Sequence, residues 1–141
     1  MRKYYEANPN AIKNKHLLAL HEALHATVCE ALGDTWNKIV LRKATGFVNW
    51  TQMLKGWKRV AMEMAPALVD DMSVSDYDNI KKYPPRTRGY AWGWLKRNRE
   101  ALMTMAKKIA AVTDGRGTLW NNDGKLMWKP IKMDWRKYVS N

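Results

Sequence analysis

Apolar positions in the first quarter of the chain recur at helical spacing. A polar arm over residues 1–10 ends in Asn8 and Pro9, which are typical of a helix cap and of a first helical turn. Gly33 is typical of a helix end. The apolar residues in between are Leu17, Leu20 or Leu24, Val28, Ala31 and Leu32. Because residues three or four apart share one face of a helix, the pattern predicts one long helix that begins after Asn8 and ends at Gly33.

The period changes after this helix. β-Branched and aromatic residues at 38–41 and 47–50 flank the turn sequence RKATG, which predicts two antiparallel strands. Near the C-terminus, residues 118–130 hold two short apolar pieces around an Asn-Asp-Gly sequence at 122–124. That composition is typical of a second hairpin.

The middle of the chain returns to helical patterns. Residues 57–72 predict a helix with a kink or boundary at Pro66, and 73–83 predict a short capped helix closed by a proline pair. We interpret 84–94 as a basic aromatic loop and 94–113 as a last long helix. The predicted fold class is α+β, mainly α, a compact helical domain with a small antiparallel hairpin or sheet beside the first helix.

Length and composition limit the class of protein. With 141 residues, the chain is expected to form one domain over 1–141. Because Cys29 is the only cysteine, an intramolecular disulfide and a thiolate zinc cage are excluded. Cys29 lies in an apolar run and is expected to be buried. No signal-peptide pattern and no apolar stretch of about 20 residues is present, so we expect a soluble, cytoplasmic protein without a membrane span.

Two of the three histidines lie four residues apart on the predicted first helix. His21 and His25 therefore project from one face and can bind a single metal ion, while Glu22 lies beside that ion. A glutamate in this position can take a proton from zinc-bound water. The third histidine, His16, follows Lys13 and Lys15 and is expected to be a surface residue.

A catalytic zinc ion needs a third protein ligand. Because the chain has no further suitable histidine and no cysteine pair, that ligand must be a carboxylate. Spacing alone leaves five candidates, which are Glu63, Asp70, Asp71, Asp76 and Asp78.

Residues 21–41, "HEALHATVCEALGDTWNKIVL", resemble the start of the FtsH-type zinc metallopeptidase domain. "GFVNW" at 46–50 is similar to the family's second strand, and "APALVDDMSVSDYDNI" at 65–80 to its Ala-rich helix and the segment with the last zinc ligand. Weak similarity extends over residues 16–126, but the usual glycine is replaced by Leu24, and the acidic pair that commonly follows the Ala-rich segment is not reproduced. The chain resembles a stand-alone form of the domain, without the ATPase module.

The resemblance implies a mechanism and a site. Its third zinc ligand is Asp76, beside the two histidines, and Glu22 is the general base that later gives its proton to the leaving amine. The implied activity is zinc-dependent hydrolysis of peptide bonds in flexible segments of a protein target. An extended substrate would add to the edge of the first hairpin. The substrate-binding residues expected there are Gly46, Phe47, Val48 and Asn49.

The formal net charge of +12 supports a second class of function. Cations that alternate with aromatic side chains can neutralise phosphates while the rings stack on bases. The alternative is therefore a basic nucleic-acid-binding or inhibitory interaction module whose metal site is structural or vestigial. The other interpretation, which the usual packing of aromatic residues favours, is that these rings pack beneath a loop and the cations face water. The residues expected to bind nucleic acid are Lys81, Lys82, Arg86, Arg88, Trp92, Trp94 and Arg97.

A peptidase with a basic surface would combine the two classes of function, because that surface could bring it to a protein that is bound to nucleic acid. The expected partners are therefore a protein or peptide substrate and, in the alternative, nucleic acid or a nucleic-acid-bound protein. The sequence leaves the oligomeric state open.

Overall fold

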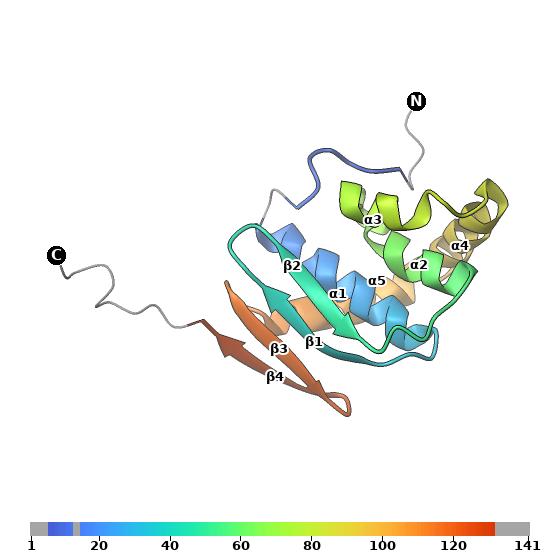
Figure 1. Cartoon of the computed structure of the whole chain (residues 1–141). Helices are drawn as coiled ribbons and strands as arrows, with labels where there is room; N and C mark the ends of the chain where they lie inside the picture. Colours follow the sequence, from blue (N-terminus) through green and yellow to red (C-terminus); the bar gives the residue numbers. More distant parts are fainter. Residues whose placement is uncertain (1–5, 13–14, 132–141) are drawn as a thin grey trace.

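Five α-helices and four strands make up the described part of the chain (Figure 1). The computed structural model describes residues 6–12 and 15–131, with only the backbone at 15 and 16, so the expectation for His16 lies outside the described side chains. The predicted α+β, mainly α class is confirmed. The elements are α1 (Lys15–Ala31), β1 (Trp36–Leu41), β2 (Gly46–Trp50), α2 (Trp57–Met64), the 3-10 helix η1 (Ala65–Val69), α3 (Val74–Ile80), α4 (Pro85–Arg97), α5 (Arg99–Val112), β3 (Gly117–Asn122) and β4 (Lys125–Pro130).

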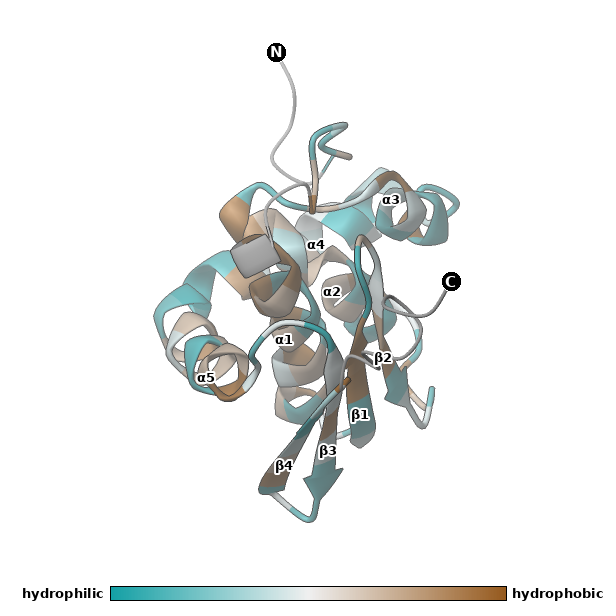
Figure 2. Cartoon of the chain, turned by 90° about the vertical axis from the view of Figure 1, so that its left-hand side faces the viewer, coloured by the Kyte–Doolittle hydropathy of each residue, from teal (hydrophilic) through white to brown (hydrophobic). Residues whose placement is uncertain are grey.

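The two predicted hairpins join into one antiparallel sheet with the strand order β2-β1-β3-β4. Ile39 at the centre of β1 pairs with Val48 of β2 and with Leu119 of β3. Ile39 and Leu119 are buried because α1 and α5 pack against this face of the sheet. Figure 2 shows the helices gathered on one side of the four strands.

Helix α1 runs through the centre of the molecule and contacts β1, β2, α2, α5 and η1. Its small residues Ala23 and Ala26 are fully buried, as are Leu24 and Val28, so neighbouring elements approach it closely on several sides. Cys29 is buried, as predicted. Among the described residues, no helix has the length and apolar character needed to span a bilayer.

The predicted start of the first helix is wrong. Residues 9–12 form turns, and the described helix begins at Lys15. The backbone N–H of Asn8 donates to the carbonyl oxygen of Met72 at 2.8 Å, and that of Ile12 donates to Asp71 Oδ1 at 2.8 Å. The segment that contains the predicted cap therefore forms hydrogen bonds with the residues after η1 instead of starting the helix.

The predicted loop at 84–94 is also wrong, because residues 85–94 belong to α4. Pro85 occupies the first turn of that helix, where its missing N–H costs nothing, and Ala91 is fully buried on its inner face. The predicted long helix over 94–113 is divided at Asn98, whose Nδ2 donates to the carbonyl oxygen of Trp94 at 2.8 Å. Pro66 lies at a boundary as predicted, since it opens η1 directly after α2.

Candidate metal centre

One turn of α1 carries the three residues of the histidine motif into the interior. His21 is 3% exposed, Glu22 4% and His25 6%, and one ligand atom from each lies within 4.8 Å of the others. The imidazole centroids are 5.0 Å apart and nearly perpendicular. The spacing of four residues has thus brought both rings to one face of the helix, as predicted.

Asp76 of α3 lies against both imidazoles. Its Oδ2 is 3.0 Å from His21 Nε2, and its Oδ1 is 3.3 Å from His25 Nε2. Two ligand atoms of a tetrahedral zinc ion, each about 2.0–2.1 Å from the metal, lie roughly 3.3 Å apart. The separations of the carboxylate oxygens from the ring nitrogens therefore fit the donor set of a zinc site.

The other nitrogen of each imidazole has its own partner. His21 Nδ1 lies 3.2 Å from Asp71 Oδ2, and His25 Nδ1 lies 2.7 Å from the carbonyl oxygen of Met62. With Nδ1–H as donor in each ring, Nε2 is the nitrogen that could bind a metal ion, and in the metal-free protein the protonated rings pair it with Asp76. Metal-ligating histidines almost always have such a carboxylate or carbonyl partner, which fixes the tautomer and the orientation of the ring.

The start of α3 holds the Asp76 carboxylate in place. Ser73 Oγ accepts a hydrogen bond from the Asp76 backbone N–H at 3.0 Å, and Asp76 Oδ2 accepts one from the Ser73 N–H at 3.3 Å. This reciprocal capping box orients the carboxylate before any ion binds. The Ser-x-x-Asp spacing is a signal in the sequence for that role.

Burial and charge shift the pKa of every group in the cluster. Burial lowers the pKa of His21, but its hydrogen bonds to Asp71 and Asp76 outweigh this and raise it to about 9. For His25, burial is likewise outweighed by the charge of Asp76, and the pKa rises to about 10. Burial would raise the pKa of Asp76, but the two histidines hold it well below its usual range. Burial raises the pKa of Glu22.

Glu22 lies between the imidazoles and the start of β2. Its Oε1 is 4.0 Å from His21 Nε2. A Cβ placed on Gly46 would be 3.2 Å from Glu22 Cγ and 2.8 Å from the carbonyl oxygen of Val40, so only glycine fits without a shift.

Among the described residues, β2 has a strand partner on one side only. Two of the predicted substrate-binding residues, Phe47 and Asn49, are exposed and face away from the helices. The other two, Gly46 and Val48, are half-buried.

The other four carboxylates that the sequence spacing left as candidates for the third ligand do not lie against both imidazoles as Asp76 does. Glu63 is buried, and its Oε2 accepts a hydrogen bond from Asn79 at 3.1 Å. Asp78 is exposed and pairs with Lys81 at 3.0 Å, and Asp70 is exposed at the end of η1. Sequence reasoning missed the contribution of Asp71 at the far side of an imidazole, because no local spacing connects it with the histidine helix.

The residues predicted to bind nucleic acid lie in the turn directly after α3 and along α4. The rings of Trp92 and Trp94 are half-buried, and Trp94 packs 5.9 Å from Trp57. Tyr90 is the large exposed ring of this helix, at 55%. The tryptophans of α4 thus pack against neighbouring elements. The predicted cations Lys81, Lys82, Arg86 and Arg97 are exposed, and Arg88 is half-buried.

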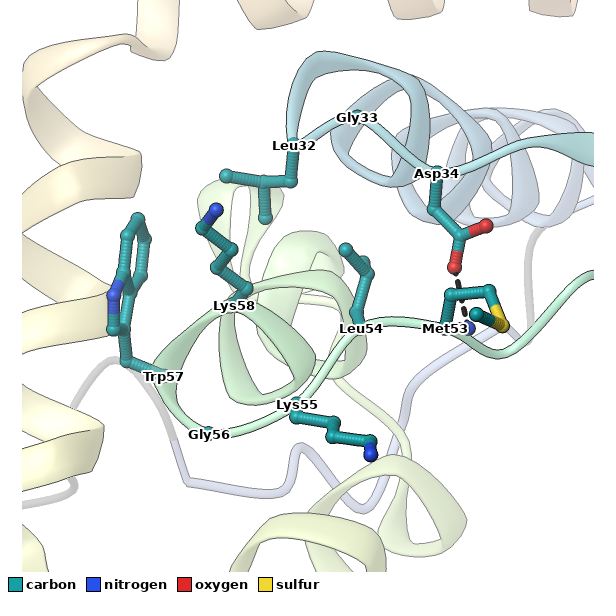
Figure 3. Close-up of a pocket in the computed structure, with 9 residues that line it drawn as sticks. All are labelled: Leu32, Gly33, Asp34, Met53, Leu54, Lys55, Gly56, Trp57 and Lys58. Carbon is teal, nitrogen blue, oxygen red and sulfur yellow. Dashed lines mark hydrogen bonds between the residues drawn. The ribbon is translucent and has the colours of Figure 1, made fainter.

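A pocket of about 480 Å³ lies at the other end of α1, where the chain leaves β2 and enters α2 (Figure 3). Asp34 stands at its rim and accepts a hydrogen bond from the Met53 backbone N–H at 2.7 Å. Hydrogen bonds from the Thr51 hydroxyl and from backbone N–H groups, that of Met53 among them, outweigh the effect of burial and lower the pKa of Asp34. Neither this pocket nor a second one of about 700 Å³ beside the C-terminal end of α5 is lined by the histidine motif.

Comparison of the chain with protein-family models, with curated proteins and with solved structures finds no significant match in any of the three.

Proposed function

We propose that the protein is a zinc-dependent metallopeptidase in which His21, His25 and Asp76 hold the ion and Glu22 transfers the proton. One observation carries this proposal, the meeting of two imidazole Nε2 atoms and one carboxylate at 3.0 and 3.3 Å in the interior. The donor set of two nitrogens and one carboxylate matches that of catalytic zinc sites, which keep a fourth position for water or substrate.

The placement of Glu22 supports a catalytic site over a structural pair of histidines. Asp76 gives each Nε2 a partner, so the histidines alone would be satisfied in a structural role. Burying a further carboxylate beside them is costly, and a structural role does not need it. A general base, however, must lie beside the reacting water and have a pKa nearer to neutrality than a free carboxylate, and burial raises the pKa of Glu22 in that direction.

The chemistry of hydrolysis follows from these residues. When bound, zinc polarises the scissile carbonyl and acidifies water. Glu22 accepts a proton from the attacking water as the new C–O bond forms. It then donates that proton to the amide nitrogen as the C–N bond breaks, so the carboxylate returns to its starting state. His21 is kept in the ligating tautomer by Asp71.

The edge of β2 is the proposed place for the substrate backbone. This strand starts at Gly46, where an added Cβ would lie 3.2 Å from Glu22 Cγ, and its outer edge has no strand partner in the described part of the chain. An extended peptide that adds to this edge would pass beside the metal ligands. Only flexible segments or exposed termini of a protein can adopt such an extended conformation without unfolding.

The test compares the wild type with two variants, all purified without a histidine tag. Elemental mass spectrometry is expected to find about one equivalent of zinc in the wild type and in Glu22→Gln, and little in His21→Ala. Cleavage of labelled casein, a disordered protein, is expected for the wild type and not for Glu22→Gln. Absence of zinc from the wild type, with none taken up in titration, would disprove the metal site. Zinc binding without cleavage that depends on Glu22 would indicate the structural site of a binding module.

A further inference from the structure

The sheet has a second face, turned away from the helices (Figure 2). Residues that pair across neighbouring strands lie side by side and share a face of the sheet. Along one strand, every second side chain belongs to that face. The first outward row runs across all four strands, and the second row lies two residues further along. The outward residues are Asn49, Lys38, Trp120 and Met127 in the first row and Phe47, Val40, Thr118 and Lys129 in the second.

Large apolar side chains on this outer sheet face are open to solvent. Phe47 is 41% exposed, Trp120 36% and Met127 41%. Trp120 and Phe47 are separated by one intervening strand and by two residues along the strands. With about 4.8 Å between strands and 3.4 Å per residue, their Cα atoms lie about 12 Å apart. The two rings therefore form separate platforms on one surface.

Each of these rings has a cation beside it. Lys38 Nζ lies 4.9 Å from the centroid of the Trp120 ring, and Arg42 Cζ lies 5.5 Å from the centroid of Phe47. The two segments that build the sheet, 35–50 and 115–131, contain six lysines and arginines and one acidic residue. The partner of this face is therefore expected to be anionic.

We propose that the outer sheet face binds single-stranded nucleic acid. Exposed rings stack on bases of any sequence, and cations next to the rings neutralise the phosphates that connect those bases. An acidic protein would use the cations but has no general need for two exposed rings with a cation beside each. The face lies outside the metal centre, so this proposal does not depend on the peptidase activity.

The basic surface of α4 fits this ligand less well than the sheet does. There Trp92 and Trp94 are half-buried and packed against the core, and Trp94 also contacts Trp57, so less of each ring is open to a base. Tyr90 is exposed, but its ring also contacts Trp57, with centroids 5.0 Å apart. Tyr90 thus provides a matched control, an exposed aromatic residue on a different basic surface.

Fluorescence anisotropy with labelled DNA and RNA oligonucleotides of about 12 nucleotides tests the proposal. Removal of one stacking ring in Trp120→Ala is expected to weaken binding about 5- to 150-fold, whereas Tyr90→Ala and Glu22→Gln should bind as the wild type does. Trp120→Phe keeps a ring and should recover most of the affinity. Circular dichroism and thermal unfolding check that each variant is folded.

Salt dependence gives an independent measurement. If Lys38, Arg42, Lys125 and Lys129 each neutralise one phosphate, the slope of log K against log salt is about −3 for a single strand. Lys38→Gln combined with Lys129→Gln should make the slope less steep by about 1.4. Neither substitution removes a buried side chain, so folding is expected to persist.

Three results would overturn the proposal. The first is the absence of oligonucleotide binding at about 50 mM salt, where phosphate contacts are strongest. The second is loss of binding in Tyr90→Ala but not in Trp120→Ala, which would assign the binding to α4. The third is equal competition by polyglutamate with no effect of Trp120→Ala, which would indicate a docking surface for an acidic protein.

Discussion

The substitution Asp71→Asn tests the metal centre without touching a proposed ligand. In the structure, Asp71 Oδ2 lies 3.2 Å from His21 Nδ1, and its Oδ1 accepts a hydrogen bond from the Ile12 backbone N–H at 2.8 Å. Both facing groups are donors when His21 binds zinc through Nε2. An asparagine amide has only one oxygen, so whichever way it is turned, its NH₂ group faces one of the two donors.

The expected loss follows from the role of such partners. Removing the carboxylate partner of a metal-binding imidazole typically weakens metal affinity 10- to 100-fold, which corresponds to about 1.4–2.7 kcal/mol of binding free energy. Because His21, His25 and Asp76 all remain, zinc is still expected to bind at saturating concentration. The predicted phenotype is therefore a raised dissociation constant with an unchanged stoichiometry.

Competition with a chromophoric chelator measures this dissociation constant, and Asp70→Asn provides the matched control. Asp70 is the adjacent residue, loses the same charge in the variant and is exposed at a left-handed position that asparagine tolerates. The control is expected to bind zinc as the wild type does. Equal affinities for Asp71→Asn and the wild type would refute the assigned role of Asp71. An equal loss in both variants would show that only net charge matters.

Three further outcomes are expected. Gly46→Ala should lower the melting temperature and the rate of casein cleavage, because its Cβ would lie 2.8 Å from a β1 carbonyl oxygen; Gly89→Ala, where the Cβ meets open space, should leave cleavage unchanged. Ser73→Ala removes the cap of α3, and urea unfolding should show a loss of about 0.5–2 kcal/mol together with weaker zinc binding. In the metal-free protein, the folded-state pKa values of about 9 for His21 and about 10 for His25 lie above the ordinary 6.5. Their contribution to stability is complete below about pH 6.5 and is lost as the pH rises toward 9–10, so the melting temperature should fall over that window; a rise there would contradict the assigned contacts.

Local geometry explains why part of the site could be predicted from the sequence. His21 and His25 must share a face because a helix repeats every 3.6 residues, and the apolar pattern around them already predicted that helix. The hairpins were predictable for a similar reason, since their turns and alternating strands are short-range features. The pairing of β1 with β3 was not, because it joins segments about 80 residues apart and no local pattern encodes it.

Long-range contacts explain what the sequence left open. Spacing could not choose among five carboxylates, whereas the family resemblance selected Asp76, and the structure places that residue against both imidazoles. The role of Asp71 could not be predicted at all, since it depends on how the end of η1 approaches α1. The error at α4 has a different cause, because Pro85 was interpreted as a helix stop although proline is equally suited to a first turn.

Leu24 stands where the FtsH-type domain that residues 21–41 resemble usually has glycine, and it illustrates how the core and the candidate site share one helix. Leu24 is fully buried in the main apolar cluster, one residue before His25, which faces the carboxylate. A glycine there would lower the stability of the helix and leave a cavity, whereas leucine fills the core at the same backbone position. The bulk of the Leu24 side chain therefore packs into the interior of the fold, while the two imidazoles proposed to bind the metal lie together with Glu22. The core-facing side of α1 thus differs from the pattern of the FtsH-type domain, whereas His21, Glu22 and His25, the α1 residues of the proposed metal centre, lie close together.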